Sequence, residues 1–151
     1  MSSVPRLQGI AVILLTSVFA LDACTPKPTE SSGRQVVEHL IAKQSSGTIR
    51  LDSFAKTNGQ QTELLGVKVY LMYYQAEIEF NNDSWWGGMT GPSTTEPFAA
   101  IPYRPSSGAP YNVLDTLLKT KVRRGDKKTI TGVLRFEQSE RGWAAEDGLV
   151  Y

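Results

Sequence analysis

The chain has 151 residues and an almost balanced charge, with 16 Lys and Arg against 15 Asp and Glu and a net charge of +1 at pH 7. This balance provides no broad positive field, so we expect no nucleic-acid partner. A single cysteine excludes an internal disulfide, and a single histidine excludes a multi-histidine metal site. The chain carries no recognisable catalytic signature, and we expect neither catalytic residues, nor a cofactor, nor a bound metal.

The first segment has the pattern of an export signal. Arg6 precedes an uncharged run that ends at Leu21, and Leu21-Asp22-Ala23-Cys24 follows. The run is shorter than the roughly 20 apolar residues of a membrane-spanning helix. Leu21, Ala23 and Cys24 resemble the lipid-attachment motif of bacterial lipoprotein signal peptides, and Asp22 departs from it. The alternative is a plain secretory signal followed by a free cysteine.

This resemblance implies that residues 1–23 are removed as a signal peptide and that Cys24 carries fatty-acyl chains in a lipid bilayer. Two or three chains anchor a protein firmly, since each buried methylene contributes roughly 0.8 kcal/mol. The residue after the cysteine is Thr25 and not the aspartate that retains many lipoproteins at the inner membrane. This favours the outer membrane of a bacterial cell envelope, with the domain facing the periplasm. Residues 24–33 are predicted to form a flexible tether, and residues 34–151 a single domain.

Residues 35–44 are predicted to form an amphipathic helix. Ser31 or Ser32 is expected to cap its start, and Gly47 to end it. Its apolar residues fall on one stripe at helical spacing: Val36, Val37, Leu40 and Ile41. The stripe predicts that the helix packs on another element.

Two strands are predicted after the helix. The first covers 48–56 and ends at a turn over 58–59. The second covers 64–80, with its first half buried on both faces and its second half on one. About 14 strand residues at about 3.3 Å each span about 45 Å, so this strand is expected to bend or to carry a bulge. Its inner face is predicted to hold Tyr70, Met72, Tyr74, Ala76, Ile78 and Phe80.

The remaining chain predicts a long loop and then a hairpin. Residues 81–110 are rich in glycine and proline, which is typical of a long loop or a set of short turns. Segments 119–123 and 129–138 are predicted to pair as a hairpin around 124–126. A closing strand is expected within 143–151.

One helix followed by long antiparallel strands predicts an α+β fold, in which one N-terminal helix packs on a curved, mainly antiparallel sheet. Residues 53–59, 76–80, 134–136 and 142–143, together with Tyr70, resemble small exported bacterial domains. The order of elements resembles the cystatin-like and NTF2-like folds. These are core and turn residues, so the resemblance implies a fold and no reaction.

The leading candidate site is the glycine-flanked pair Trp85 and Trp86. Neighbouring side chains in an extended chain point to opposite sides, so one of the two is expected to be exposed. With Phe98 and Tyr103, this loop can offer an aromatic surface to an envelope protein, a glycan or membrane headgroups. The alternative is a lid folded over an open end of the sheet.

A second candidate is a group of cations around the predicted hairpin turn, which can meet phosphate, anionic headgroups or an acidic partner. Its candidate contact residues are Lys121, Arg123 and Arg124. The alternative is a set of solvated cations that protects an edge strand from pairing with other chains.

Two further positions carry titratable groups. Glu77 and Glu79 share a predicted strand face, where two carboxylates can divide acid and base roles or hold a hard cation. The alternative is an exposed face that pairs with a cation such as Arg135. His39 is expected to be a partly buried surface histidine at the edge of the helix stripe.

These observations favour a non-enzymatic, membrane-anchored interaction or ligand-binding module of the cell envelope. The alternative is an enzyme or small-ligand protein of the NTF2-like kind, with Glu77 or Asp115 as general base. Tyr70 or Tyr74 would then supply a polar group in its pocket. A purely structural role in the envelope is a third class.

Overall fold

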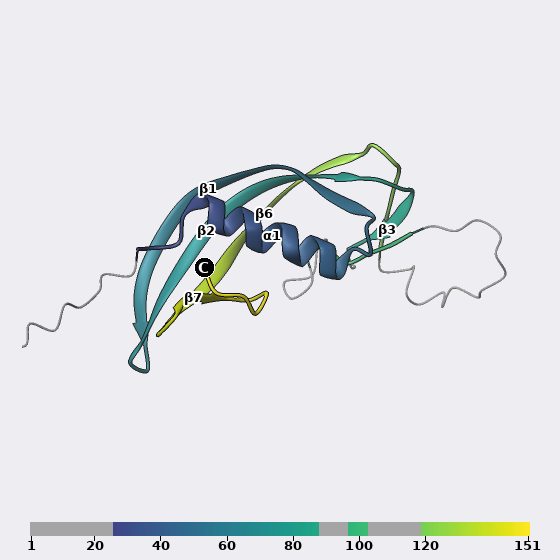
Figure 1. Ribbon diagram of the computed structural model, residues 1–151. Helices are drawn as coiled ribbons and strands as arrows, with labels where there is room; N and C mark the ends of the chain where they lie inside the picture. The colour runs from purple at the N-terminus through teal and green to yellow at the C-terminus, as the bar shows by residue number, and fades with distance from the viewer. Residues whose placement is uncertain (1–25, 88–96, 103–118) are drawn as a thin grey trace, which may run out of the picture.

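The structure is a computed structural model that describes residues 26–87, 97–102 and 119–151. This part of the chain forms one helix and two antiparallel sheets, in the strand orders β1-β2-β6-β7 and β4-β3-β5 (Figure 1). The predicted α+β class, with a helix packed on an antiparallel sheet in a single domain, is confirmed. The elements are α1 Glu30–Gln44, β1 Ile49–Leu64, β2 Val67–Phe80, β3 Ser84–Trp86, β4 Ala100–Pro102, β5 Thr120–Val122, β6 Lys127–Ser139 and β7 Gly142–Ala145.

Helix α1 begins at Glu30, earlier than the sequence pattern predicts. The Thr29 hydroxyl accepts a hydrogen bond from the Ser32 N–H (3.3 Å), and the Ser32 hydroxyl accepts one from the Thr29 N–H (3.4 Å). This reciprocal cap satisfies two amide groups that a helix start otherwise leaves unbonded. The tether predicted over 24–33 is therefore too long, because the first turn of the helix lies within it.

The buried face of α1 is the predicted one, and it approaches the sheet closely at Gly33. A Cβ atom at this position would lie 2.3 Å from Met72 Sδ and 2.9 Å from Phe54 Cζ. The absence of a side chain thus lets the helix backbone approach the sheet at this point. The buried residues of this face are Gly33, Val36, Val37, Leu40 and Ile41.

Strands β1 and β2 form one long hairpin, and the prediction of a turn over 58–59 is wrong. Asn58 and Gly59 lie within β1, and the chain turns at Leu65 and Gly66 instead. The register between β1 and β2 shifts between Lys56 and Asn58, so β1 has one residue more than β2 at this point. Glycine is needed at position 59, because a Cβ atom there would lie 1.9 Å from Tyr70 Oη.

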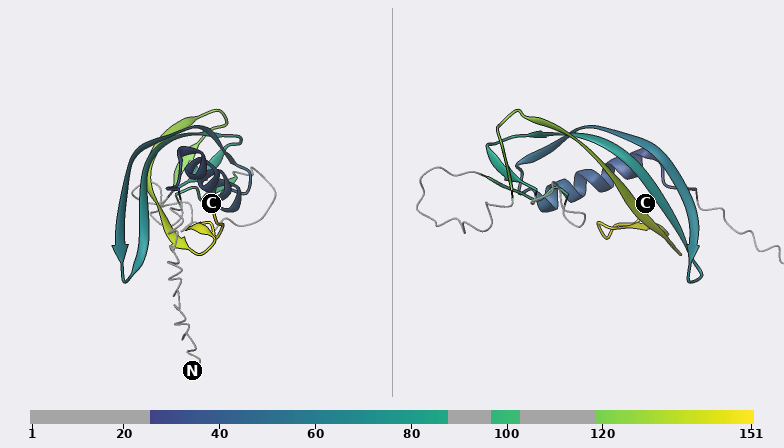
Figure 2. Two further views of the ribbon diagram at one scale, coloured as in Figure 1. Left: turned by 60° about the vertical axis from the view of Figure 1, so that its left-hand side comes forward. Right: turned by 180° about the vertical axis from the view of Figure 1, so that it is seen from behind.

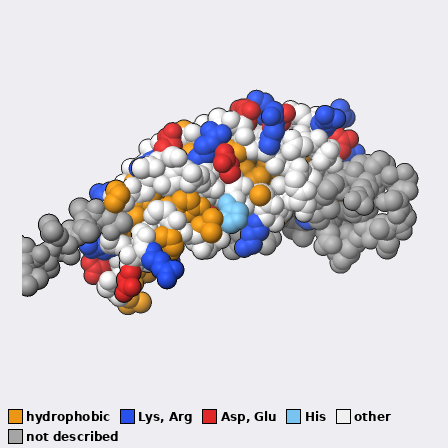
Figure 3. Space-filling model, in the orientation of Figure 1, with side chains coloured by type: hydrophobic (Ala, Val, Ile, Leu, Met, Phe, Trp, Pro, Cys, Tyr) orange, Lys and Arg blue, Asp and Glu red, His pale blue; other side chains and the backbone are white. Residues whose placement is uncertain are grey.

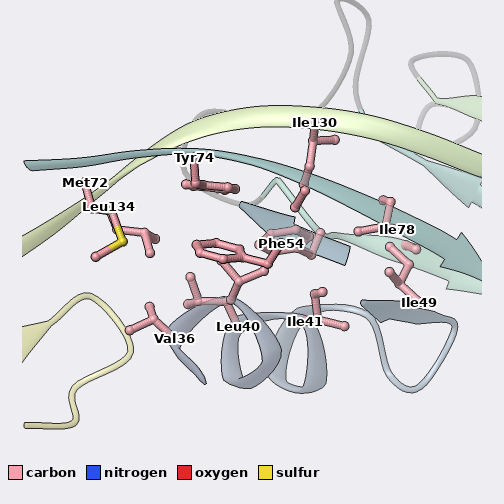
Figure 4. Packing of buried hydrophobic residues seen from close by; sticks show 14 of the residues in the cluster. Val36, Leu40, Ile41, Ile49, Phe54, Met72, Tyr74, Ile78, Ile130 and Leu134 are labelled. Atoms are coloured by element: carbon pink, nitrogen blue, oxygen red, sulfur yellow. The ribbon is translucent and has the colours of Figure 1, made fainter. Parts of the chain in front are cut away.

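The predicted inner face of β2 is confirmed, since its six alternating residues from Tyr70 to Phe80 are all buried. They fill the space between the sheet and α1 together with inward residues of β6 (Figure 4). Burial, with a smaller contribution from Glu146, raises the pKa of Tyr74 to about 12 and keeps this phenol neutral. On the outer face of the first half, Val69 is buried but Val67 is 40% exposed, so burial on both faces is only partial.

Strands β5 and β6 do not form the predicted hairpin. Strand β5 pairs with β3 in the small sheet, whereas β6 pairs with β2 and β7 in the main sheet. The corner between them is fixed to the end of β2, where the Phe80 N–H donates to the Asp126 carbonyl (3.0 Å) and the Gly125 N–H donates to the Phe80 carbonyl (2.7 Å). The region predicted as a long loop, 81–110, contains the short strands β3 and β4.

The predicted closing strand is present as β7, and the last residues fold back on it. Trp143 and Tyr151 exchange two backbone hydrogen bonds of 3.0 and 2.9 Å. The Trp143 indole Nε1 donates to the Pro26 carbonyl (2.8 Å). Residues from the beginning and the end of the described chain are therefore joined on the inner side of the sheet.

The main sheet curves around α1, so that the helix lies in its concave side (Figure 2). The two ends of this curved sheet differ. We call the end with residues 64–67 and the β6–β7 turn the turn end, and the end with the small sheet and residues 123–126 the corner end. The 14 residues of β2 run between them, and at about 3.3 Å per residue the path is about 45 Å long. Among the described residues, no helix has the length and apolar character needed to cross a membrane.

Candidate functional site

Trp86 and Phe98 belong to the core at the corner end. Trp86 is 8% exposed, packs edge-on against Phe80 with 5.6 Å between ring centroids, and donates from Nε1 to the Pro97 carbonyl (3.3 Å). Phe98 is fully buried, and its N–H donates to Gln44 Oε1 (3.1 Å). These two side chains are therefore not available to a partner in this fold. Their position matches the alternative of a lid over the end of the sheet.

Trp85 points to the other face of β3 and is half-buried. Its register partner on β5 is Lys121. Directly paired residues of antiparallel strands stand on the same face of a sheet, so the indole and the ammonium-bearing side chain are neighbours. Tyr103 and Cys24, the other predicted contact and attachment residues, lie outside the described residues.

Arg123 and Arg124 lie on a turn whose backbone is held at several points. The Arg123 N–H donates to Asp126 Oδ2 (2.8 Å), and the Arg124 N–H donates to Asp83 Oδ1 (2.9 Å). Both arginine residues are exposed, and neither has an ion-pair partner within residues 26–87, 97–102 and 119–151. We call Lys121, Arg123 and Arg124 the basic corner. Figure 3 shows Lys and Arg side chains at this end of the molecule as well as along the rest of the visible face.

Lys127, which follows this turn, has a compensated charge. Its ammonium lies 2.7 Å from Asp52 Oδ2 and 3.1 Å from Glu77 Oε1 on the outer face of the sheet. The hydrogen bonds with Asp52 and Glu77 raise the pKa of Lys127, and the hydrogen bond with Lys127 lowers the pKa of Asp52. This cation therefore fixes neighbouring strands and adds little to the field of the basic corner.

The two strand carboxylates, Glu77 and Glu79, each take part in an ion pair. Glu77 contacts Lys127, and Glu79 Oε2 lies 2.6 Å from Arg50 Nη2. Arg135, the cation expected opposite them, lies 2.7 Å from Glu137 instead. Both carboxylates lie on the outer face, away from the tyrosines of the core, so they are not arranged to serve a pocket inside the sheet.

One cluster of titratable groups has no clear signal in the sequence. Asp147 has a fully buried side chain that accepts hydrogen bonds from the Tyr151 hydroxyl, the Leu149 N–H (3.0 Å) and His39 Nδ1 (3.1 Å). Burial opposes ionisation of this carboxyl, but the hydrogen bonds outweigh it and lower the pKa of Asp147. Burial and the hydrogen bond to Asp147 raise the pKa of Tyr151.

This cluster joins the C-terminal segment to α1. An ionised carboxylate only accepts hydrogen bonds, so His39 donates through Nδ1, and its Nε2 is left for another contact. Such a pair orients an imidazole for acid–base work, but a hydroxyl or thiol nucleophile bonded to His39 is not present among the described residues. Sequence reasoning placed His39 at the edge of the helix stripe and did not find Asp147, because an Asp-Gly pair near a chain end has the pattern of an ordinary turn.

The described residues contain no group of three or more His, Cys, Asp or Glu that could hold a metal ion. Comparisons with protein-family models, with curated proteins and with solved structures find no match for this chain.

Proposed function

We propose that this protein is a membrane-anchored lipoprotein of the bacterial cell envelope that acts as a non-enzymatic interaction module. Acylated Cys24 holds it to the bilayer, and the domain faces the periplasm. Its contact site for an acidic envelope protein or glycan is formed by the basic corner and Trp85.

We also propose that the fold is a variant of the cystatin-like or NTF2-like arrangement. The support is the order of its elements, in which one helix precedes long antiparallel strands that curve around it. The small sheet β4-β3-β5 is an addition at one end of this arrangement.

The observation that carries the functional proposal is the position of the basic corner. It lies at the corner end, whereas Pro26, which follows Cys24 by two residues, is bonded to Trp143 toward the turn end. A domain anchored through Cys24 would thus present the basic corner away from the lipid surface. The exposed guanidinium groups on a hydrogen-bonded turn are suited to bidentate contacts with carboxylate or sulfate groups.

The enzymatic alternative has less support. The tyrosines that it would use, Tyr70 and Tyr74, are only 4% exposed in the core, and Glu77 lies on the opposite face of the strand in an ion pair. Asp115 lies outside the described residues. A pocket between helix and sheet would need the space that the buried side chains occupy (Figure 4).

Photo-crosslinking in living bacteria tests the proposal. A photoreactive residue at position 124 is expected to capture a discrete envelope protein or glycan, and the same residue at position 131, exposed in the middle of β6, is the control. Mass spectrometry of the purified protein must also show acyl chains on Cys24. An unmodified Cys24 overturns the anchor, and equal capture at positions 124 and 131 overturns the contact site.

A further inference from the structure

The β1–β2 turn carries an exposed apolar group at the turn end. Leu65 is 97% exposed, Leu64 is 51% exposed and Val67 is 40% exposed. Leu65 also has a φ of 52°, in the left-handed region that leucine rarely adopts. The leucine gains little packing in exchange for this backbone strain, so packing within the domain does not account for its presence.

The register of the main sheet places the β1–β2 turn and the β6–β7 turn at the same end of the sheet. Leu64 pairs with Val67 to close the β1–β2 hairpin, and Ser139 pairs with Gly142 to close the β6–β7 hairpin. These two turns lie at one end of the sheet, because β2 and β6 are antiparallel neighbours from Val69 onward. Figure 1 shows both turns at this end.

The start of the described chain is fixed beside the residue that follows the β6–β7 turn. Trp143 follows Gly142 directly and donates to the Pro26 carbonyl, and its ring packs edge-on against Tyr70 of β2 with 6.1 Å between centroids. Cys24 precedes Pro26 by two residues, and two Cα–Cα steps span at most about 7.6 Å. An acyl anchor on Cys24 would therefore hold the turn end close to the lipid surface.

We propose that residues 64–67 form a second membrane contact, in which Leu64, Leu65 and Val67 insert into the headgroup zone of the bilayer to which Cys24 is anchored. This inference rests on the proposed function. Apolar side chains at a membrane surface bind by burying area, and the effective concentration set by a short tether makes even a small contact effective.

The charges near the turn indicate which lipids it needs. Lys27, Lys68 and Arg141 are exposed on this end, and so are Glu63 and Glu140. Because the two signs nearly balance, the contact does not depend on anionic lipid. Phosphatidylcholine vesicles are therefore a sufficient membrane for the test.

The test uses the full-length acylated protein in phosphatidylcholine vesicles that contain a spin-labelled quencher lipid. A polarity-sensitive fluorophore is attached to Leu65→Cys and, as the matched control, to Thr129→Cys at the corner end. We expect a blue shift and strong quenching at position 65 and neither change at position 129. Equal, water-like emission at the two positions in a protein with acylated Cys24 overturns the membrane contact and leaves the anchor intact.

A second measurement separates the membrane from other partners of the turn. The variant Leu64→Thr/Leu65→Asn/Val67→Thr places β-branched residues in the strands and a turn-compatible residue at position 65, so its unfolding should stay cooperative. We expect energy transfer from position 129 to labelled lipid headgroups to increase in this variant, because the domain is free to tilt toward the bilayer. Unchanged transfer, or shielding of position 65 only when other envelope proteins are added, overturns the proposal. An unmodified Cys24, shown by mass spectrometry, overturns the proposed function instead.

Discussion

The two ends of the curved sheet differ in which side chains they bury and which they expose. At the corner end, the large aromatic side chains Trp86 and Phe98 are buried, and the cations of the basic corner are exposed. At the turn end, Leu64 and Leu65 are exposed, and the charges nearly balance. Trp86 and Phe98, which are prominent in the sequence, thus stabilise the fold, whereas the exposed apolar group at the turn end consists of Leu64, Leu65 and Val67.

This difference follows from what each end is joined to. The end of β2 at Phe80 continues into the small sheet, which gives the tryptophan and phenylalanine rings a second layer to pack against. The β1–β2 turn extends past the inner core, and α1 begins at Glu30 without covering it (Figure 2). A large side chain is buried only where another element covers it, so residue type alone does not decide burial.

The largest expected effect separates the two tryptophans of the corner end. Trp86→Ala should lower the free energy of unfolding by about 3–5 kcal/mol, because it removes a buried ring and leaves a cavity against Phe80. Trp85→Ala should cost only about 1 kcal/mol, because its side chain is half-buried. Urea unfolding of the full-length protein measures both.

Trp86→Phe is the control for this comparison, since it keeps most of the ring volume and loses the hydrogen bond to the Pro97 carbonyl. Its loss of stability should be smaller than that of Trp86→Ala. Equal losses in the two alanine variants would contradict the assignment of Trp86 to the core and of Trp85 to a half-buried position on the other face of β3.

A smaller effect is expected at Asp147, which joins the C-terminal segment to α1. Asp147→Asn should lower the free energy of unfolding by about 1.5–3 kcal/mol, because it weakens charge-assisted hydrogen bonds from His39 and Tyr151. The pKa of Asp147 is lowered from its ordinary value of 3.8, so the folded state favours the ionised form. Its contribution is fully present above that value and is lost as the pH falls through the lower folded pKa.

Chemical denaturation between pH 2 and 7 measures this dependence. The free energy of unfolding of Asp147→Asn should fall less on acidification than that of the wild type, because the variant lacks the carboxylate whose protonation causes part of the loss. Glu137→Gln, which removes an exposed carboxylate, is the matched control and should leave the pH profile almost unchanged. Identical profiles for wild type and Asp147→Asn would contradict the role of the ionised carboxylate.

The sequence predicted the inner face of β2 and the buried face of α1 well. Period-two alternation along 70–80 identified the buried face of β2, and the helical stripe identified the face of α1 that covers it. Both patterns are local and repeated, so neighbouring residues support the same assignment. The fold class followed from them.

The turns and the site were predicted less well, because they depend on contacts between distant residues. Asn58 and Gly59 have a strong turn signal, but the space at Gly59 is taken by the Tyr70 hydroxyl of the neighbouring strand. The chain turns at Leu65 and Gly66 instead, where leucine is not a turn residue and the single glycine lies within the predicted strand 64–80. The two segments expected to pair around 124–126 belong to two different sheets. The turn between them is hydrogen-bonded through Gly125 and Asp126 to the backbone of Phe80 instead. Asp147 and His39 are 108 residues apart, and no local pattern connects them.

The third expected effect concerns the strain at the turn end. Leu65→Asn should raise the free energy of unfolding by about 1 kcal/mol, because asparagine tolerates the left-handed conformation and the leucine is almost fully exposed. Leu65→Ala keeps the strained backbone and should bring no such gain. Urea unfolding in detergent compares the three proteins, and a loss of stability in Leu65→Asn would show that the leucine packs within the domain.

The smallest effect on stability is expected at the basic corner, whose exposed residues are cations, whereas those of the turn end are apolar. Arg123→Ala/Arg124→Ala removes two exposed guanidinium groups but keeps the backbone hydrogen bonds to Asp126 and Asp83, so the free energy of unfolding should change by less than about 0.5 kcal/mol. A photoreactive residue at position 85, which pairs with Lys121 of the basic corner, is expected to capture the same partner. This capture should be lost in the same variant, because two of the three cations of the basic corner are gone. Lys127→Ala is the matched control: it removes a neighbouring cation whose charge is already compensated, and capture should persist. Loss of capture in both variants would mean that net charge alone attracts the partner, and persistence in both would remove the basic corner from the contact site.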